Sequence, residues 1–165
     1  AAACGYAFRR ETLADLRFYP GLFHEDELFT PQLFLKAKSL VEVDARAYYY
    51  RQRAGTITSS RSQASVQKRL DDMHFIARLL RSMDEPMLER RVRQLTADYL
   101  QKTWTLTGSS RELCRRANEL RQEGFLPLPL VCYSLRYLLI ALLSKGLGHG
   151  ARSNFQFSTF NLFNF

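Results

Sequence analysis

The sequence predicts an α+β fold, in which a small mixed sheet of short strands with one helix is followed by a bundle of three to four helices. Two observations support this prediction. Up to about residue 60, short runs of β-branched and aromatic residues are broken by Gly and Pro, a pattern typical of strands and turns. Beyond residue 60, apolar residues recur at helical spacing through long segments. The 165 residues, 46% of them hydrophobic, are enough to bury a core.

The first part of the chain predicts four short strands and two helices. The strands are expected where β-branched, aromatic and apolar residues cluster, over residues 5–8, 22–23, 40–43 and 47–51. A short helix is expected near residues 11–16 and a longer one over 26–38. Pro31 has no amide hydrogen for an interior bond, so we expect it to kink or restart the longer helix, with Thr30 as a candidate cap.

The second part of the chain predicts two long helices in succession. The first spans about residues 62–82, because its apolar residues alternate spacings of four and three along one stripe: Val66, Leu70, Met73, Ala77 and Leu80. The second should begin with Pro86 in its first turn and carry four large residues inward, namely Leu88, Val92, Leu95 and Tyr99.

Two further helices complete this part. Ser109, followed three residues later by Glu112, matches a capping box, and this helix should end near Gly124. The last helix, over about residues 129–145, is apolar nearly all round, which is typical of a buried helix or of one lying in a membrane interface. The chain therefore divides into residues 1–60, a helical region 61–150, and an aromatic, Phe-rich tail 151–165 that carries no charge from Ser153 onward.

Charge and cysteine content limit the classes of protein to consider. The net charge is +8, and residues 61–165 carry most of it, with 16 Lys and Arg against 9 Asp and Glu. Such a field attracts anionic lipid, phosphorylated substrates or nucleic acid alike. The three cysteines are far apart and form no Cys-x-x-Cys motif, which fits a reducing compartment. No apolar run reaches the ~18 residues that would cross a bilayer.

Two ordered motifs suggest a family. The segment FYPGLFHEDELF occupies residues 18–29, and YYYRQRAGTIT occupies 48–58, with FRRETL upstream at 8–13. Together they resemble the acceptor-side, C-terminal half of bacterial family 2 glycosyltransferases of the GT-A type. The resemblance covers roughly residues 5–60 and is looser to about residue 80. Thr56 stands where the family usually has Ser, and the chain lacks the family's Asp-Asp-Gly-Ser and Asp-x-Asp motifs.

The resemblance implies a fold and an activity. The short strands would belong to a partial GT-A mixed sheet. The full-length protein would be an inverting glycosyltransferase that moves a sugar from a nucleotide-sugar donor to a glycan or lipid-linked acceptor in cell-surface polysaccharide synthesis. It would work in the cytoplasm or at the inner face of the membrane, with a divalent cation (Mg or Mn) held elsewhere. Because its nucleotide-binding half is missing, this chain is expected to hold no cofactor and to be inactive alone.

The acidic motif supplies the candidate catalytic residues. Inverting sugar transfer needs a base that takes the proton of the acceptor hydroxyl, and a carboxylate at a turn before a helix suits that task. We assign Asp26 as this base, Glu25 as a residue that orients the acceptor or the loop, and His24 as an acceptor-binding residue. The alternative is that Asp26 merely caps a helix, because acidic residues are common at that position.

The second motif supplies candidate residues for the leaving group. Arg51 and Arg53 fall on one side of an extended strand and Thr56 follows them, so these three residues would bind the departing diphosphate. The alternative is an edge strand that ends in solvated arginines. No metal ligands are assigned, because His24, His74 and His149 are scattered along the chain.

A second function, of a different class, fits the charge. The chain could be a non-enzymatic basic helical module that binds nucleic acid or a protein partner. Nucleic acid is disfavoured, because the arginines are spread over several helices without interleaved aromatic residues. The apolar segment 128–143 and the basic helices also predict peripheral membrane contact, with an ordinary core helix as the alternative. An open sheet edge would favour a homodimer.

Overall fold

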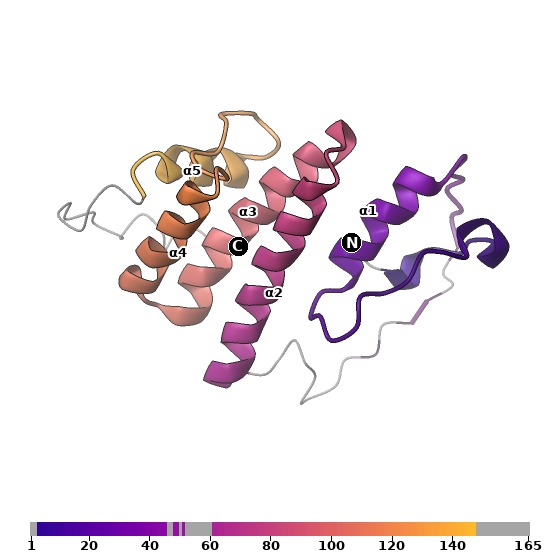
Figure 1. Ribbon diagram of the computed structural model, residues 1–165, viewed down its shortest axis with the longest axis horizontal. Helices are drawn as coiled ribbons and strands as arrows, with labels where there is room; N and C mark the ends of the chain where they lie inside the picture. The colour runs from indigo at the N-terminus through magenta and orange to yellow at the C-terminus, as the bar shows by residue number, and fades with distance from the viewer. Residues whose placement is uncertain (1–2, 46–47, 50, 52–60, 148–165) are drawn as a thin grey trace. The chain divides into compact units, whose positions relative to one another are not determined.

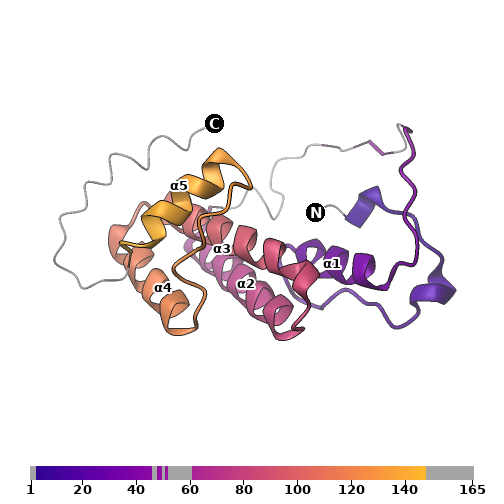
Figure 2. The same cartoon turned by 90° about the horizontal axis from the view of Figure 1, so that it is seen from above.

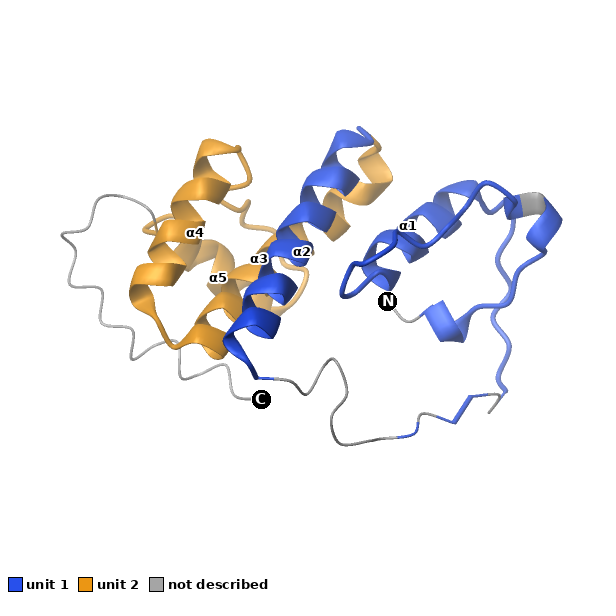
Figure 3. Ribbon diagram, turned by 60° about the horizontal axis from the view of Figure 1, so that its bottom comes forward, with its two compact units in different colours: residues 1–84 blue, residues 85–165 orange. Residues whose placement is uncertain are grey.

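The computed structural model describes residues 3–45, 48–49, 51 and 61–147, and it is all-α over that part of the chain. The chain forms two compact units, Ala1–Asp84 and Glu85–Phe165 (Figure 3). Within the described residues there are five α-helices and two short 3-10 helices (Figure 1). None of these helices is both long and apolar enough to cross a membrane.

The first unit is built around two α-helices. Two 3-10 helices, η1 (Ala3–Gly5) and η2 (Arg10–Leu13), come before α1 (Asp26–Lys36), and α2 (Gln63–Ser82) ends the unit. Its small core joins η2 to α1 through four buried residues, Leu13, Leu16, Phe29 and Leu33. Ala3 and Tyr6 pack against this core. The ring of Phe18 stacks on that of Phe29 with centroids 4.1 Å apart. The segment before α1 is thus held to the helix by side-chain packing.

Helix α1 tolerates its proline. It runs from Asp26 to Lys36 with Pro31 inside, so the expected restart at this residue is wrong. Thr30 lies buried within the helix and does not cap one. Pro31 is the sixth helical residue, so its missing amide costs α1 a single interior hydrogen bond, which burial of Leu28, Phe29 and Leu33 can offset.

Helix α2 confirms the periodicity prediction. The Oγ atom of Ser62 accepts a hydrogen bond from the Ser65 amide, 3.2 Å away, which begins the helix at Gln63. Its buried apolar residues repeat at helical spacing and include most of the predicted stripe: Leu70, Met73, Ile76, Ala77 and Leu80. Helix α2 therefore presents one continuous apolar face.

The second unit is a three-helix arrangement. Helix α3 (Pro86–Thr107) packs against both α4 (Ser110–Gln122) and α5 (Leu135–Ser144), as Figures 1 and 2 show. The start at Pro86 and the four inward residues of α3 are as predicted. Gly108 ends α3 in the left-handed region, with φ of 59°, and its amide donates to the Trp104 carbonyl at 2.8 Å.

Helix α5 is shorter than predicted. It begins at Leu135 rather than near residue 129, because the Ser134 hydroxyl accepts from the Tyr137 amide at 3.1 Å and sets the start. Upstream, the Val131 amide donates to the Pro129 carbonyl and the Tyr133 amide to the Val131 carbonyl. These two tight turns take up the backbone groups that a longer helix would use.

The expected α+β fold with a partial GT-A mixed sheet is wrong for the described residues, which contain no strand. Residues 5–8, 22–23, 40–43 and the described part of 47–51 are irregular or lie at a 3-10 helix; residues 46–47 and 50 are outside the described part. A strand exists only when its backbone is paired. Leu40, Val41 and Val43 are instead 69%, 79% and 73% exposed. Residues of this type favour strands when one face of the strand is buried, and these three side chains are exposed instead.

Candidate active site

The predicted acidic motif spans the end of the turn before α1 and the first residues of that helix. The turn opens with Pro20 and Gly21, and Gly21 has φ of 78°, a conformation that L side chains rarely adopt. His24 also has a positive φ, 60°. The Glu27 amide donates to the His24 carbonyl at 3.0 Å and the Phe29 amide to the Glu25 carbonyl at 2.9 Å, which closes the first turn of α1. The backbone thus fixes residues 24–26 at the helix start.

Helix α2 holds this turn in place. The Phe23 amide donates to Oδ2 of Asp72 at 2.7 Å, and the Lys68 ammonium donates to the same oxygen at 2.7 Å. The ammonium also lies 5.0 Å from the centre of the Phe23 ring. Because Asp72 is buried, this charge-assisted bond is a strong anchor for the chain just before His24.

A second contact secures the other side of the turn. The ring of Tyr19 packs edge-on against that of Phe75, with centroids 5.3 Å apart. Tyr19 and Phe23 therefore both rest on α2, on either side of Gly21. The segment between them is short, so the position of the acidic motif that follows is set by α2 as well as by α1.

Capping does not explain the acidic motif. The residue at the N-cap position of α1 is Glu25, which has helical dihedral angles and makes no side-chain capping hydrogen bond. Asp26 follows as the first helical residue. The helix begins through the backbone bonds of its first turn, and Asp26 and Glu27 lie in that turn, where negative charge interacts favourably with the helix dipole.

The environment of Asp26 changes its acidity. Its side chain is half-buried, and burial raises the pKa of the carboxyl above its ordinary value; the neighbouring Glu27 and Glu25 also raise it, while His24 lowers it. A carboxylate whose pKa is raised binds a proton more readily, which is the property a general base requires. Glu25 is exposed beside it.

The other predicted site residues are not brought to this turn within the described part of the chain. Arg51 is exposed, lies outside any helix, and forms no hydrogen bond or ion pair with residues 24–26. Arg53 and Thr56 lie outside the described residues. The structure therefore joins His24, Glu25 and Asp26 in one turn and leaves the diphosphate assignment as a prediction.

The described residues do not fit a metal ion. Over residues 3–45, 48–49, 51 and 61–147, no three His, Cys, Asp or Glu side chains converge closely enough to hold one. The acidic residues 25–27 lie in a single turn, but oxygen ligands for Mg²⁺ must converge on one point. No catalytic step is therefore assigned to a cation held by this part of the chain.

Asp72 and Lys68 were missed by the sequence analysis. Both lie on α2, whose apolar stripe was recognised while its charged residues were given no role. One signal was present: Lys68 and Asp72 are four residues apart, a spacing that lets their side chains pair. The sequence could not show that the pair also binds the backbone of a segment 49 residues away.

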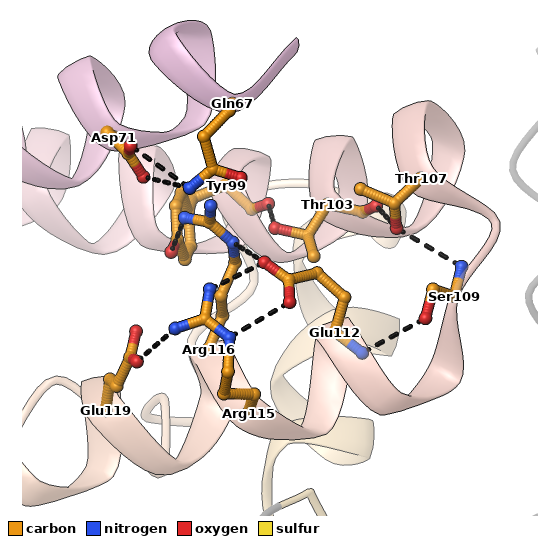
Figure 4. Close-up of polar contacts among 10 residues, drawn as sticks. All are labelled: Gln67, Asp71, Tyr99, Thr103, Thr107, Ser109, Glu112, Arg115, Arg116 and Glu119. Carbon is orange, nitrogen blue, oxygen red and sulfur yellow. Dashed lines mark hydrogen bonds and ion pairs between the residues drawn. The ribbon is translucent and has the colours of Figure 1, made fainter. Parts of the chain in front are cut away.

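The second unit holds a separate buried polar cluster, shown in Figure 4. Arg116 of α4 is only 2% exposed; its Nη1 donates to the Tyr99 hydroxyl at 2.7 Å and its Nε to Glu112 Oε1 at 2.6 Å. Arg115 donates to both oxygens of the same carboxylate. These hydrogen bonds lower the pKa of Glu112 to about 2, with Arg115 the main cause. The cluster ties α3 to α4, and we assign it a structural role.

Comparison with known proteins adds no family to this geometry. No protein-family model, curated protein or solved structure is similar enough to the chain to count as a match. The resemblance to family 2 glycosyltransferases therefore rests on the two motifs of the sequence.

Proposed function

We propose that this chain is the acceptor-side part of an inverting glycosyltransferase and that Asp26 is its general base. The observation that carries the proposal is the placement of Asp26: a half-buried carboxylate with a raised pKa, at the start of α1 directly after a turn that α2 anchors through Asp72. A base that must meet an incoming hydroxyl at a fixed angle needs such a rigid support. The motif resemblance supplies the reaction class.

The proposed step moves one proton and exchanges one bond. The carboxylate of Asp26 takes the proton of an acceptor hydroxyl while that oxygen bonds to the anomeric carbon of the donor sugar. The bond from that carbon to the nucleotide diphosphate breaks with its electron pair, so the configuration inverts and the diphosphate leaves. Glu25 and His24 orient the acceptor, and Arg51, Arg53 and Thr56 meet the charge of the leaving group.

The proposed activity belongs to the full-length protein. The chain lacks the motifs with which the family holds its nucleotide and cation, so by itself it should bind a nucleotide sugar weakly and transfer none. The donor would be a cytoplasmic nucleotide sugar and the acceptor a glycan or lipid-linked glycan in polysaccharide synthesis. We accordingly place the protein in the cytoplasm, working at the inner face of the membrane.

The test compares two Asp to Asn variants in the full-length protein. Asp26→Asn should lower kcat for sugar transfer by about 10²- to 10⁴-fold, the usual range for a general base, with a smaller change in KM for the acceptor. Asp15→Asn is the matched control, because Asp15 lies in the same unit but is exposed and paired with Lys36. Retention of most activity by Asp26→Asn would reject Asp26 as the base.

A stability measurement separates loss of catalysis from loss of folding. The pKa of Asp26 is raised in the folded state, so its ionisation is less favourable folded than unfolded, and its contribution to stability falls as pH rises through that pKa. At neutral pH Asp26→Asn should therefore leave Tm unchanged or slightly higher. A variant that is inactive because it unfolds would instead show a lower Tm.

A further inference from the structure

Helix α5 turns an apolar face outward from the second unit. Its buried residues, Tyr137, Ile140, Ala141 and Ser144, follow helical spacing and mark the side that packs inward. The opposite side of the helix carries Leu135, Leu139 and Leu142, which are 73%, 37% and 48% exposed. Leu138 and Leu143 are half-buried on the two margins. We call Leu135, Leu139 and Leu142 the leucine face.

The leucine face exposes apolar side chains at positions where a surface helix usually carries polar ones. A helix on the surface of a globular unit normally buries one apolar stripe and turns polar residues outward. In α5 both sides are apolar, and the three central outward positions are all leucine. A continuous exposed patch of this kind marks a surface that is covered in use. We propose that it docks on the surface of an anionic lipid bilayer.

Charges at the edges of the leucine face favour that occupant. Arg136 lies on one margin of α5 and Lys145 follows its C-terminal end; both are exposed. From Gly124 to the end of the sequence there is no acidic residue. Exposed leucines bordered by Lys and Arg are typical of helices that lie in a bilayer interface, because the leucines enter the acyl boundary while the cations meet anionic headgroups.

Two arginines of α3 extend the basic border towards the start of α5. The guanidinium of Arg90 lies 5.1 Å from the centre of the Tyr133 ring, and Arg93 donates to the Tyr133 hydroxyl at 3.1 Å. Two acids of α3 offset part of this charge, since Glu89 pairs with Arg93 and Asp98 with Arg136. Lys145 and Arg90 remain as exposed cations at opposite ends of the helix.

The length of α5 fixes the mode of contact. Ten residues form a helix of about 15 Å, roughly half the hydrocarbon thickness of a bilayer, so α5 cannot cross it. With its inner side packed against α3, the helix can only lie along the surface. The sequence left membrane contact and a core helix as alternatives for this segment. In the proposed arrangement the inner side of α5 packs in the core and its outer side contacts the membrane.

The leucine face is held ready for docking. The Ser144 hydroxyl accepts from the Leu128 amide at 3.0 Å, and Arg121 of α4 donates to the Ser144 and Leu147 carbonyls at 2.8 and 2.5 Å. These bonds fix the C-terminal end of α5, so the helix need not unpack or refold to present its leucines. Contact with a surface then costs little conformational entropy.

A second copy of the chain is a poorer occupant. In a two-fold symmetric pair the same patch faces itself, so the basic margins of the two leucine faces would meet. Whether the two helices pair parallel or antiparallel, the basic residues at the ends of one α5, Arg136 and Lys145, would lie near those of the other copy, and α5 has no acidic residue to balance them. An anionic surface removes this repulsion and gains from the same charges.

The experiment measures binding of the chain to lipid vesicles by co-sedimentation. Vesicles of phosphatidylcholine alone are compared with vesicles containing about 30% phosphatidylserine. The variant replaces all three residues of the leucine face: Leu135→Gln, Leu139→Gln and Leu142→Gln. The control replaces three apolar residues of the first unit that are on average more exposed than the leucine face, Leu40→Gln, Val41→Gln and Val43→Gln. Circular dichroism checks that each variant keeps its helices, and sedimentation velocity follows the oligomeric state.

The lipid proposal predicts how vesicle binding should differ between the parent chain and its variants. The chain should bind phosphatidylserine vesicles several-fold more tightly than neutral ones, and the leucine-face variant should lose at least about tenfold of this binding while the control triple keeps it. Lys145→Gln should weaken binding to the anionic vesicles by roughly fivefold. Equal binding by the leucine-face variant, or no preference for phosphatidylserine, would overturn the proposal.

Two further outcomes are decisive. If the leucine-face variant turns a dimer into a monomer but binds vesicles like the parent chain, the face belongs to a second copy and the lipid proposal fails. Vesicle binding needs no sugar donor and involves only the second unit, whereas Asp26 lies in the first. The lipid proposal and the glycosyltransferase proposal can therefore each fail without the other.

Discussion

Arg116 illustrates how a single buried charge is stabilised in this protein. A guanidinium withdrawn from water is costly unless its donors are hydrogen-bonded to groups that attract it. Arg116 meets this need with the Glu112 carboxylate and the Tyr99 hydroxyl, and its guanidinium carbon lies 5.6 Å from the centre of the Tyr99 ring. Glu112 in turn is shared with Arg115. Loss of Glu112 would remove the carboxylate that Arg115 and Arg116 share.

Stability should therefore depend on pH through Glu112. Its folded pKa of about 2 lies below the ordinary 4.5, so its contribution is full above about pH 5 and disappears as pH falls towards 2. The carboxylate is 25% exposed, and with screening we expect about 2 kcal/mol. Glu112→Gln should be less stable than the parent chain by this amount at pH 7. The difference should shrink to near zero at pH 2 in urea unfolding.

Glu119→Gln is the matched control for this prediction. Glu119 pairs with the same Arg115, but both partners are largely exposed. Exposed pairs contribute little, so this variant should lose less than about 0.5 kcal/mol at any pH. Equal losses in the two variants would mean that the buried Arg116 contributes nothing to the effect at Glu112.

Glu112 forms only half of the capping box predicted with Ser109. Ser109 accepts from the Glu112 amide at 3.2 Å, as the capping-box prediction requires. The reciprocal bond is replaced, because the Ser109 amide donates to the Thr107 hydroxyl and the Glu112 carboxylate binds two arginines. Charged donors bind a carboxylate more strongly than a neutral amide does. The sequence identified the helix start but not the residue on which α3 and α4 converge.

At the scale of elements, α2 has two roles that its apolar stripe does not reveal. Its stripe is buried, and its Asp72 and Phe75 side chains hold the turn that carries the acidic motif. A helix that supports a site from behind can impair that site when altered, even though no atom of it touches a substrate. The anchor can be tested without any assay of activity.

Replacing Asp72 should loosen the turn before α1. Asp72→Ala removes the acceptor of the Phe23 amide and the partner of Lys68, which should cost about 1–3 kcal/mol. Hydrogen exchange of the amides of residues 23–26 should become faster. Asp71→Ala is the control, because Asp71 is exposed on the same helix and accepts from Gln67. Unchanged exchange in Asp72→Ala would show that the turn is held by other contacts.

Periodicity predicted the long helices and failed for the strands, for one physical reason. A long amphipathic helix satisfies its own backbone, so its pattern of apolar residues is nearly sufficient evidence, as in α2 and α3. A strand needs a neighbouring strand to form its backbone hydrogen bonds. The composition of Leu40, Val41 and Val43 therefore favours a strand without being sufficient to form one. The start of α5 at Leu135 was missed because the helix was predicted from its apolar composition, and Ser134 was not recognised as a cap.

The candidate site was predictable in part. The sequence predicted a helix over residues 26–38 with Asp26 at its start, and the structure confirms that start. The raised pKa of Asp26 could not be read from sequence, because it depends on burial as well as on its acidic neighbours. The anchor to α2 could not be read either, since it joins residues that are distant along the chain.

At the scale of the whole molecule, the net charge of +8 makes a prediction about nucleic acid. Binding to duplex DNA should be weak and indifferent to base sequence, and it should fall at least about tenfold between 50 and 200 mM salt, because it rests on displaced counterions. Fluorescence anisotropy with two unrelated duplexes would measure this. A sequence-selective complex that survives 200 mM salt, unaffected by Asp26→Asn, would favour the non-enzymatic alternative.

The joint between α3 and α4 bears on how the second unit folds. Only Gly108 and Ser109 separate the two helices, so bringing them together closes a very short loop and loses little chain entropy. Contacts between near neighbours in sequence form quickly. This helical hairpin is accordingly the expected nucleus of the unit, and α5, which follows the longer connection 123–134, would dock onto it afterwards.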